Sequence, residues 1–373
     1  MSAKVLFIAT VDKGHILKFH VPYLKYFKEK GYEVHVACAG NETIPYCDKR
    51  YNISFEQSPI KFKNIRAYKD LKKIVNQQHY SIIHCHTPVG GVIGRLAAKK
   101  TRRTGTNVLY TAHGFHFYKG APFKNWLLFY PIEKWLSKYT DCLITINEED
   151  HQNALMHNFK SGYIEKVNGV GVNLTRFSPP NFDEKKVLRE KSGYEESDFL
   201  IVYIADLNHN KNQNMIINVI NMLKIKIPNV RLLLVGEGSL LEEYKKKTFK
   251  LGLDNYIDFL GFRRDVPSIL KMVDVAISTS KREGLPVNIM EAMATGLPTV
   301  VTNCRGNRDL IINDQNGYVV EINDEIAFSQ AIMKLYNSKK IMNNFGEKNI
   351  QLIRKNSLEN VMKEMEKIYS NFM

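Results

Sequence analysis

Residues 283–298, EGLPVNIMEAMATGLP, carry the sequence pattern that decides the fold. The apolar run Val275–Ser278 before them predicts a strand, and the spacing of the apolar residues within them predicts a helix. Gly284 permits a tight turn between the two, and the proline that follows suits the first turn of a helix. We therefore expect Glu283 in the loop before the helix and Glu291 inside it.

The beginning of this helix has the chemistry of an anion site. A helix N-terminus offers free N–H groups and the positive end of the helix dipole. Val287 and Asn288 can present theirs to a diphosphate, with Leu285 in the loop before them. Carboxylates on either side, Glu283 and Glu291, would accept hydrogen bonds from sugar and ribose hydroxyls. Spacing alone leaves a second interpretation open, a plain capped helix with one acidic loop residue.

Short apolar runs alternate with helical segments along the whole chain. In the second half the expected strands are Phe199–Ala205, Arg231–Val235, Ile257–Leu260, Val275–Ser278 and Thr299–Thr302. In the first half they are Lys4–Thr10, Glu33–Ala37, Ser81–Cys85, Val108–Ala112 and Cys142–Ile146. Strands alternating with helices predict mostly parallel sheets covered on both faces. The fold class is therefore α/β, with two doubly wound Rossmann-like domains facing a central cleft and a C-terminal helix.

A linker separates the two halves. Phe177–Phe182 (FSPPNF) contains consecutive prolines, which fit neither a helix interior nor a central strand. We expect an N-terminal domain over residues 1–180 and a C-terminal domain over residues 181–356. Residues 357–373 are expected to form a helix that is capped by Ser357 and packs back on the N-terminal domain.

Composition limits the function classes. The five cysteines include no CxxC pair, and Cys38, Cys85 and Cys142 lie in or beside apolar runs, which indicates buried free thiols rather than a disulfide framework or a zinc site. Residues 1–180 carry 26 Lys and Arg against 13 Asp and Glu, within a net charge of +15, so this half favours an anionic partner or reflects a basic composition alone. The first apolar run is too short for a signal peptide. We expect a cytoplasmic protein, or one bound peripherally at the cytoplasmic face of the plasma membrane.

Residues 283–298 match E-x7-E in the form EG-x-P-x4-E-A-M-A-x-G-x-P throughout. Further matches follow apolar runs, in the segments Val235–Gly238 (VGEG), Leu260–Arg263 (LGFR), Thr111–Gly114 (TAHG) and Asn168–Asn173 (NGVGVN). Together these motifs resemble the retaining GT-B glycosyltransferases of family four, especially capsular and exopolysaccharide enzymes. The resemblance extends over most of the chain. It implies that residues 1–180 form the acceptor-side domain and residues 181–356 the nucleotide-sugar-binding domain.

The resemblance implies roles at the matching positions. Glu283 would act on the donor sugar and Glu291 would bind the ribose. Lys211 would neutralise the donor diphosphate, although sequence alone favours an ordinary surface lysine there. Phe262 and Arg263 would lie against the nucleotide base.

One position departs from the family pattern. Asp206 stands where the family usually has an arginine that contacts the diphosphate. Arg282, Arg305 and Arg308 are the candidates to replace that arginine, and spacing does not choose among them.

Two positions in the first half complete the implied site. His113 follows an expected strand and would contact the donor sugar near the reacting carbon. Gly14 follows the first strand, where a glycine lets the backbone approach a ligand or simply forms a turn. His84, His86, His113 and His116 raise the possibility of a metal site. We expect no metal and no cofactor, since no carboxylate completes a ligand set and the family needs no metal.

The acceptor side offers a membrane interpretation. Residues 118–139 (YKGAPFKNWLLFYPIEKWLSKY) interleave aromatics with lysines, and Trp126, Phe129, Tyr130 and Trp135 resemble interfacial anchors. Arg95, Lys99, Lys100, Arg102 and Arg103 form an expected basic cluster. An anionic membrane surface and a saccharide or polyprenyl-diphosphate-linked saccharide acceptor would fit them, and an ordinary core helix would fit the aromatics equally.

The sequence therefore predicts a retaining glycosyltransferase. It would move a hexose or N-acetylhexosamine from a nucleotide-diphosphate sugar, expected to be a UDP-sugar, to a growing saccharide in cell-surface polysaccharide biosynthesis. A UDP-sugar 2-epimerase is the first alternative, since it shares architecture and donor. A nucleic-acid binder is the second, and no nucleic-acid partner is expected because charge alone does not explain the acidic pair.

Overall fold

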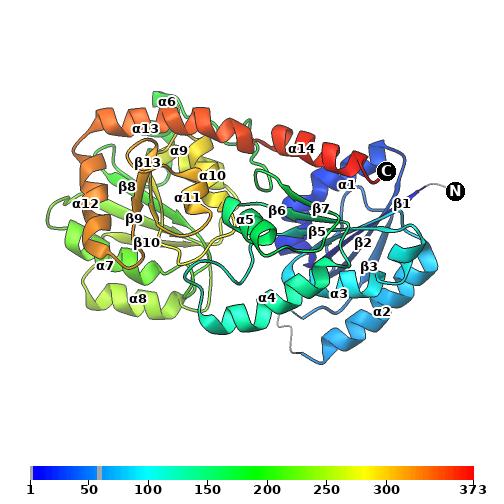
Figure 1. Cartoon of the computed structure of the whole chain (residues 1–373). Helices are drawn as coiled ribbons and strands as arrows, with labels where there is room; N and C mark the ends of the chain where they lie inside the picture. Colours follow the sequence, from blue (N-terminus) through cyan, green and yellow to red (C-terminus); the bar gives the residue numbers. More distant parts are fainter. Residues whose placement is uncertain (1–2, 57–60) are drawn as a thin grey trace. The chain divides into compact units, whose positions relative to one another are not determined.

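The computed structural model of the chain describes residues 3–56 and 61–373. The chain divides into two compact units. Figure 1 shows the whole chain, coloured along its sequence. Unit 1 comprises Met1–Gly171 and Val361–Met373, and unit 2 comprises Val172–Asn360. The C-terminal helix therefore returns to the unit that begins the chain.

Unit 1 is built on a parallel sheet with the strand order β3-β2-β1-β4-β5-β6-β7. Its strands are β1 (Lys4–Val11), β2 (Glu33–Ala39), β3 (Lys49–Asn52), β4 (Ile82–His86), β5 (Asn107–Ala112), β6 (Cys142–Thr145) and β7 (Tyr163–Lys166). In the centre, Phe7 of β1 pairs with Val36 of β2 and His84 of β4. The side chains of β1 and β4 are almost all buried, as expected for strands covered on both faces.

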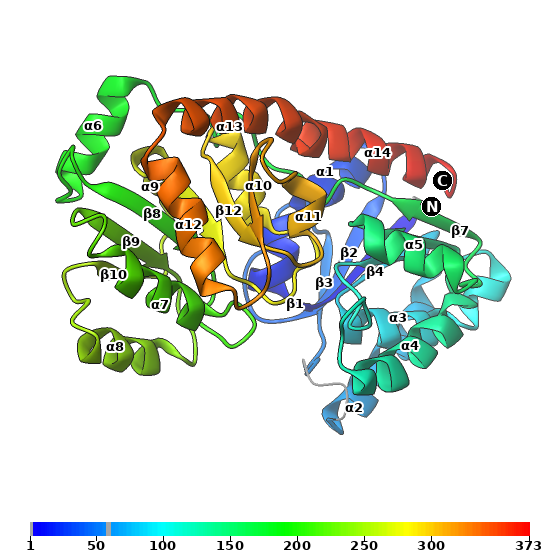
Figure 2. The same cartoon turned by 60° about the vertical axis from the view of Figure 1, so that its left-hand side comes forward.

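Helices cover both faces of this sheet, with α2, α3 and α4 on one side and α1 and α14 on the other (Figures 1 and 2). The helices are η1, a π-helix (Asp12–His20), α1 (Val21–Glu29), α2 (Lys63–Gln78), α3 (Pro88–Ala98), the 3₁₀-helix η2 (Thr101–Thr104), α4 (Phe123–Ser137), α5 (Glu148–Met156) and α14 (Leu358–Ser370). Tyr369 of α14 is fully buried and packs edge-on against Phe27, with ring centroids 4.7 Å apart. Ser357 caps α14 by accepting a hydrogen bond from the Asn360 N–H at 3.2 Å.

Unit 2 contains a parallel sheet of order β10-β9-β8-β11-β12-β13. Its strands are β8 (Phe199–Ile204), β9 (Val230–Val235), β10 (Ile257–Gly261), β11 (Val275–Ser278), β12 (Thr299–Thr302) and β13 (Gly317–Val320). The helices are α6 (Phe182–Lys191), α7 (Gln213–Leu223), α8 (Leu241–Lys250), α9 (Val266–Met272), α10 (Val287–Ala294), α11 (Asn307–Leu310), α12 (Glu325–Tyr336), α13 (Lys339–Leu352) and the 3₁₀-helix η3 (Ile353–Asn356).

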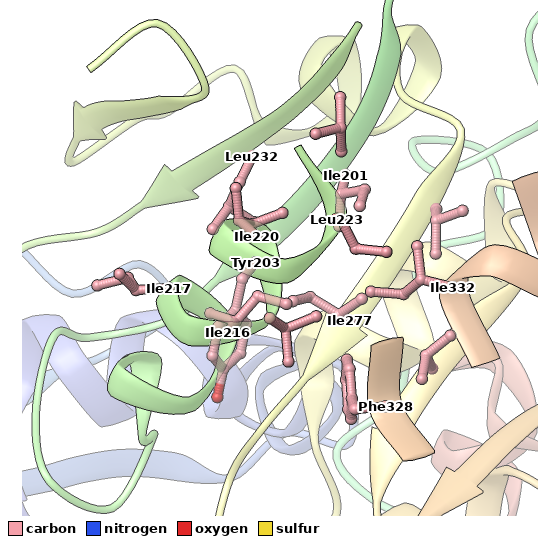
Figure 3. Close-up of a cluster of buried hydrophobic side chains, with 14 of the residues drawn as sticks. Ile201, Tyr203, Ile216, Ile217, Ile220, Leu223, Leu232, Ile277, Phe328 and Ile332 are labelled. Carbon is pink, nitrogen blue, oxygen red and sulfur yellow. The ribbon is translucent and has the colours of Figure 1, made fainter. Parts of the chain in front are cut away.

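The core of unit 2 forms between its sheet and helices α7 and α12. Figure 3 shows side chains from β8, β9 and β11 meeting those of the two helices. Ile220 of α7, Ile277 of β11 and Phe328 of α12 are almost completely buried in it. Each such side chain contributes about 1.5–3 kcal/mol of hydrophobic stabilisation relative to an exposed position. This packing fixes the strands whose carboxyl ends carry the site residues.

The expected fold class is confirmed: both units are parallel α/β sheets covered by helices. The expected strands are all present, and the free, buried thiols expected at Cys38, Cys85 and Cys142 are confirmed. The strands β3, β7 and β13 were missed; each has four residues and lies at a sheet edge. No helix within the described ranges is both long and apolar enough to span a bilayer.

Candidate functional site

The strand order of unit 2 defines its ligand-binding edge. β9 lies on one side of β8 and β11 on the other, so the order reverses between β8 and β11. In open α/β sheets, ligands bind beyond the carboxyl ends of the strands at such a switch point. The loop that leaves β8 contains Lys211, and the loop that leaves β11 contains Glu283. The sequence predicted both residues for the donor site.

Lys211 and Glu283 form an ion pair at this switch point. The Lys211 Nζ lies 2.5 Å from the Glu283 Oε1, and the two side chains are 21% and 11% exposed. Charges this close and this well shielded from water interact more strongly than an exposed pair. A ligand that binds the Lys211 ammonium must therefore compete with the Glu283 carboxylate.

Buried hydroxyl groups fix the backbone that carries Lys211. The Tyr203 hydroxyl donates to the Lys211 carbonyl at 2.8 Å. The Thr279 hydroxyl lies 3.0 Å from both the Lys211 and the Asn212 carbonyls. Tyr203 and Thr279 are buried at the carboxyl ends of β8 and β11. The position of the ammonium is thus set from within the sheet.

The first turn of α10 follows directly. Val287 begins the helix, and its N-cap residue Pro286 makes no side-chain cap hydrogen bond. Its N–H groups and the helix dipole therefore suit an anion. The Asn288 side-chain amide donates to the Ile204 carbonyl at 2.9 Å, which ties the turn to β8. Leu285 is buried in the preceding loop, and Glu291 is the fifth residue of α10 and half-buried.

The loop after β12 positions Glu283 from the other side. Gly306 has φ +82°, and a β-carbon there would lie 2.5 Å from the Gly284 carbonyl oxygen. Only glycine fits such a close approach in this backbone conformation. The adjacent Arg305 is buried, and its Nε donates to the Glu283 carbonyl at 2.9 Å. Two loops are therefore locked together around the carboxylate.

Asp206 stands where the family pattern has an arginine, and the contacts of the nearby arginines show how each is held. Asp206 is exposed, and of the three arginines that could replace the expected one, Arg305 is tied to the Glu283 loop. Arg308 donates to the Asn303 side chain at 3.1 Å, and Arg282 accepts through its carbonyl from Asn210. Arg305 therefore has a direct bond to a predicted site residue.

The segment after β10 carries the two residues predicted to contact the base. Phe262 is 66% exposed. The Arg263 guanidinium donates to Asp265 at 2.7 Å, and this contact raises the pKa of Arg263 above its ordinary value. Both residues lie in a solvent-exposed loop beside the edge strand, and contact with a nucleotide base stays a prediction for them.

The strand order of unit 1 reverses between β1 and β4, and histidines gather at that point. His15 and His20 lie on η1 after β1, His86 ends β4, and His113 follows β5. The His15 Nδ1 and the His20 Nε2 are 2.8 Å apart, and the His113 Nε2 lies 3.4 Å from the His86 Nδ1. The His15 ring also packs edge-on against the His113 ring, with centroids 4.6 Å apart. The structure thus places beside the predicted His113 two histidines, His15 and His20, that the sequence did not single out.

Burial keeps these imidazoles neutral at neutral pH. Burial lowers the pKa of His113 to about 4 and, with the nearby His113 ring, that of His84 to about 3. His84 bonds to the Tyr369 hydroxyl and to Thr111, each at 2.8 Å, so it is a satisfied core residue. His116 packs on an α4 ring instead. The four histidines considered from sequence therefore do not share one centre.

Gly14 lies on the π-helix η1 and not in the expected turn, and Asp12 anchors the start of this helix. A β-carbon at Gly14 would meet only the Val11 side chain at 3.5 Å, an ordinary contact, so packing does not require glycine there. The Asp12 carboxylate is buried, pairs with Arg50 at 2.8 Å and accepts a hydrogen bond from the Glu42 N–H at 2.9 Å. Burial raises the pKa of Asp12, but these hydrogen bonds outweigh it and leave the pKa below its ordinary value.

The predicted basic cluster is wrong at Arg95. This side chain is 1% exposed, and its guanidinium lies 2.8 Å from the Glu133 carboxylate and 3.9 Å from the centre of the Tyr110 ring. Arg95 thus joins α3 to α4 inside the unit. No local sequence pattern indicates this ion pair, because the partner lies 38 residues away along the chain.

The predicted aromatic anchors are also partly wrong. Trp126, Phe129 and Tyr130 pack against the core of unit 1, because they share one face of α4. Trp135 is exposed, as expected. Other exposed apolar residues accompany it on the outer side of α4: Phe123, Leu127, Leu128 and Ile132.

Sequence reasoning missed several residues that shape the two sites. Tyr203 carries a weak signal, as a hydroxyl near the end of an otherwise apolar strand. His15 and His20 could have been found from their position after the first strand, but their contact depends on a π-helix that the pattern does not predict. Arg305 carries no signal beyond its charge.

Comparisons with known proteins cover both units. The family model Glycosyl transferases group 1 matches residues 184–352, and Glycosyl transferase 4-like matches residues 4–147. The chain is 46% identical over 373 residues to the putative glycosyltransferase EpsD of Bacillus subtilis (strain 168), with 100% of this chain and 98% of the relative covered.

A second relative is the UDP-Gal:alpha-D-GlcNAc-diphosphoundecaprenol alpha-1,3-galactosyltransferase of Escherichia coli. It is 30% identical over 321 residues, which cover 83% of this chain and 81% of the relative. Among solved structures, Anabaena Alr3699/HepE in complex with UDP and glucose superposes with a TM-score of 0.83. That likeness covers 99% of this chain and 100% of the other at 17% identity, and it supports the GT-B fold expected from the sequence.

Proposed function

This chain belongs to the group 1 glycosyltransferases, and from that premise we propose which transfer it performs. It moves a hexose or N-acetylhexosamine from a UDP-sugar to a growing, lipid-linked saccharide. The anomeric configuration is retained, and the product serves cell-surface polysaccharide biosynthesis. The observation that carries the donor half is the Lys211–Glu283 ion pair at the switch point of unit 2.

The donor diphosphate is the anion that suits the first turn of α10. The N–H groups of Val287 and Asn288 bind phosphate oxygens, and Lys211 turns from Glu283 toward the same charge. Negative charge grows on the leaving UDP as its bond to the sugar breaks. A lysine and a helix N-terminus already in place stabilise that charge without reorganisation. A structure with bound UDP and glucose in the same fold supports this donor.

Glu283 then holds the donor sugar rather than attacking it. Displaced from Lys211 by the diphosphate, its carboxylate accepts hydrogen bonds from sugar hydroxyls. The acceptor hydroxyl attacks the anomeric carbon on the face that UDP leaves. The new carbon–oxygen bond forms as the old one breaks, and the acceptor proton passes to a donor phosphate oxygen. Contact of His113 with the sugar stays a prediction.

The protein's own cations meet the diphosphate charge in this proposal, so transfer needs no metal. Transfer should proceed unchanged in the presence of EDTA. Lys211 and the uncapped turn of α10 supply the positive charge, and Arg305 holds the loop between them.

The acceptor half rests on the outer side of α4. Phe123 and Leu127 are 80% and 68% exposed there. The Lys138 ammonium lies 5.1 Å from the Trp135 ring centre, so positive charge is interleaved with the exposed apolar side chains. Apolar side chains that insert and lysines that attract anionic headgroups together favour binding to a membrane surface. The E. coli relative is named for an undecaprenol-linked acceptor, which supports a substrate held in a membrane.

Sedimentation with anionic vesicles tests this half. The chain should sediment at low salt and be partly released at high salt. Leu127→Asp should weaken binding, while Ile225→Asp, at a similarly exposed position in unit 2, should not. A chain that stays in the supernatant at low salt removes the membrane proposal.

Turnover tests the whole proposal. Glu283→Gln should lower transfer strongly with thermal unfolding unchanged, while Glu243→Gln, on the exposed surface of α8, should transfer normally. NMR of the product gives its anomeric configuration. Formation of a sugar epimer from UDP-sugar without any acceptor would instead identify a 2-epimerase.

A further inference from the structure

We propose that His15, His20 and His113 form a binding site for a divalent transition-metal ion of the zinc class. Each of the three residues offers a ring nitrogen, and these nitrogens all lie within 4.8 Å of one another. Imidazole is the protein ligand that zinc, copper and nickel share. The site lies in unit 1, outside the nucleotide-binding residues of unit 2.

The backbone is built to bring two of these ligands together. His15 and His20 are five residues apart, and in an α-helix such residues point about 140° away from each other. They lie instead on η1, a π-helix, whose i→i+5 pattern places them one turn apart. Their rings are stacked, with centroids 4.9 Å apart. A π-helix is uncommon and often marks a functional site, and here it aligns the two imidazoles.

Some ring nitrogens of the surrounding histidines lack a hydrogen-bond partner. The His20 Nδ1 and the His86 Nε2 are buried without a partner within the part of the chain described. Both residues are 1% exposed. His20, His86 and His113 also line a cavity of about 10 Å³, which has room for one water or one ion. Two of the three proposed ligands, His20 and His113, thus border a small cavity with unsatisfied nitrogens, while His15 lies outside its lining.

Little movement would complete the coordination. Zinc–nitrogen bonds of about 2.0–2.1 Å in a tetrahedral site place the ligand nitrogens about 3.4 Å apart. The His15 and His20 nitrogens are hydrogen-bonded at 2.8 Å, so they must give up that bond and move apart by about 0.6 Å. The His113 nitrogen lies within 4.8 Å of both and must approach by up to about 1.4 Å. Buried imidazoles are neutral, which is the form that binds metal. Three histidines leave the fourth position open to water.

Metal at this site should inhibit the enzyme. This consequence, unlike the binding itself, rests on the proposed function, in which His113 contacts the donor sugar. A metal-bound imidazole cannot also bond to a sugar hydroxyl through the same nitrogen. Occupancy would also stiffen η1, which leaves β1 at the switch point of unit 1.

Direct binding tests the site without any activity measurement. The purified, chelator-treated chain is titrated with Zn²⁺ by calorimetry and with Co²⁺, whose visible absorption reports tetrahedral coordination. We expect one equivalent, with affinity at least about tenfold lower in His15→Asn and His20→Asn, since even outer partners of metal ligands contribute that much. His79→Asn is the matched control, because His79 is exposed and has φ +48°, which asparagine tolerates.

The outcomes are distinct. Absence of Zn²⁺ binding, or equal binding by wild type and a folded His15→Asn variant, overturns the proposal. The His15 side chain is only half-buried, so this variant keeps the test valid if His20→Asn fails to fold. Zn²⁺ should then inhibit transfer by the wild type and by His79→Asn. A chain that binds Zn²⁺ but transfers no sugar would refute the proposed function and leave the metal site standing.

Discussion

Two substitutions at the ion pair should change UDP affinity in opposite directions. Lys211→Met removes the ammonium that meets the diphosphate. A hydrogen bond to a charged group contributes about 1.5–3 kcal/mol, which corresponds to roughly ten- to a hundred-fold in Kd. The free lysine is already paired with Glu283 at 2.5 Å, so part of that gain is offset, and we expect the lower end, about tenfold weaker binding.

Glu283→Gln removes the competitor instead of the cation. An exposed ion pair contributes up to about 1 kcal/mol, and this pair is better shielded from water, so its loss should tighten UDP binding by roughly fivefold or more. Turnover should nevertheless fall, because the sugar loses its carboxylate partner. This divergence between affinity and rate is the signature of competition for Lys211.

Isothermal titration calorimetry with UDP measures both affinities. Lys226→Met is the matched control, since this exposed lysine lies beyond the other end of α7 and should leave Kd unchanged. If Lys211→Met binds UDP as the wild type does, the ion pair is not at the diphosphate. If Glu283→Gln weakens UDP as much as Lys211→Met, the two residues cooperate rather than compete.

Three further predictions concern stability and the loops. Arg95→Met should lower the free energy of unfolding in urea by about 3–5 kcal/mol, because it leaves the buried Glu133 carboxylate without its partner. Replacing both residues by apolar ones should restore most of that stability. A single variant as stable as the wild type would contradict the buried pair. Because the pKa of Asp12 is lowered in the folded state, its carboxylate stabilises the fold at pH values above its unfolded pKa. This stabilisation should be lost as the pH falls through the folded pKa, and Asp12→Asn should flatten this part of the plot of unfolding free energy against pH. An identical plot for the variant would show that the carboxylate does not stabilise the fold. Gly306→Ala should strain its loop by about 1–3 kcal/mol and weaken UDP in calorimetry, and unaltered binding would show that the loop does not position Glu283.

The sequence predicted the sheets because buried parallel strands leave a strong local signal. Phe199–Ala205 and Cys142–Ile146 are continuous apolar runs, since helices cover both faces. The edge strand Lys49–Asn52 was missed because its side chains are half-exposed and polar. The edge strand β10 was predicted from Ile257–Leu260, because its sequence is more apolar.

The residues of the donor site could be predicted from the sequence, but the contacts between them could not. The motif around Glu283 and the position of Lys211 identified two residues that the structure brings together. Their ion pair depends on the reversal of strand order between β8 and β11, which sequence does not state. Arg95 and the α4 aromatics show the same limit, because charge and aromatic character do not tell which face of a helix is buried.

Hydrogen–deuterium exchange with and without UDP tests the central claim most directly. The account predicts slower exchange in the segment around Lys211 and in the first turn of α10, at Val287 and Asn288, with the first strands of unit 1 unchanged by UDP alone. Protection confined to other segments, or none at saturating UDP, would contradict a nucleotide site at the switch point of unit 2.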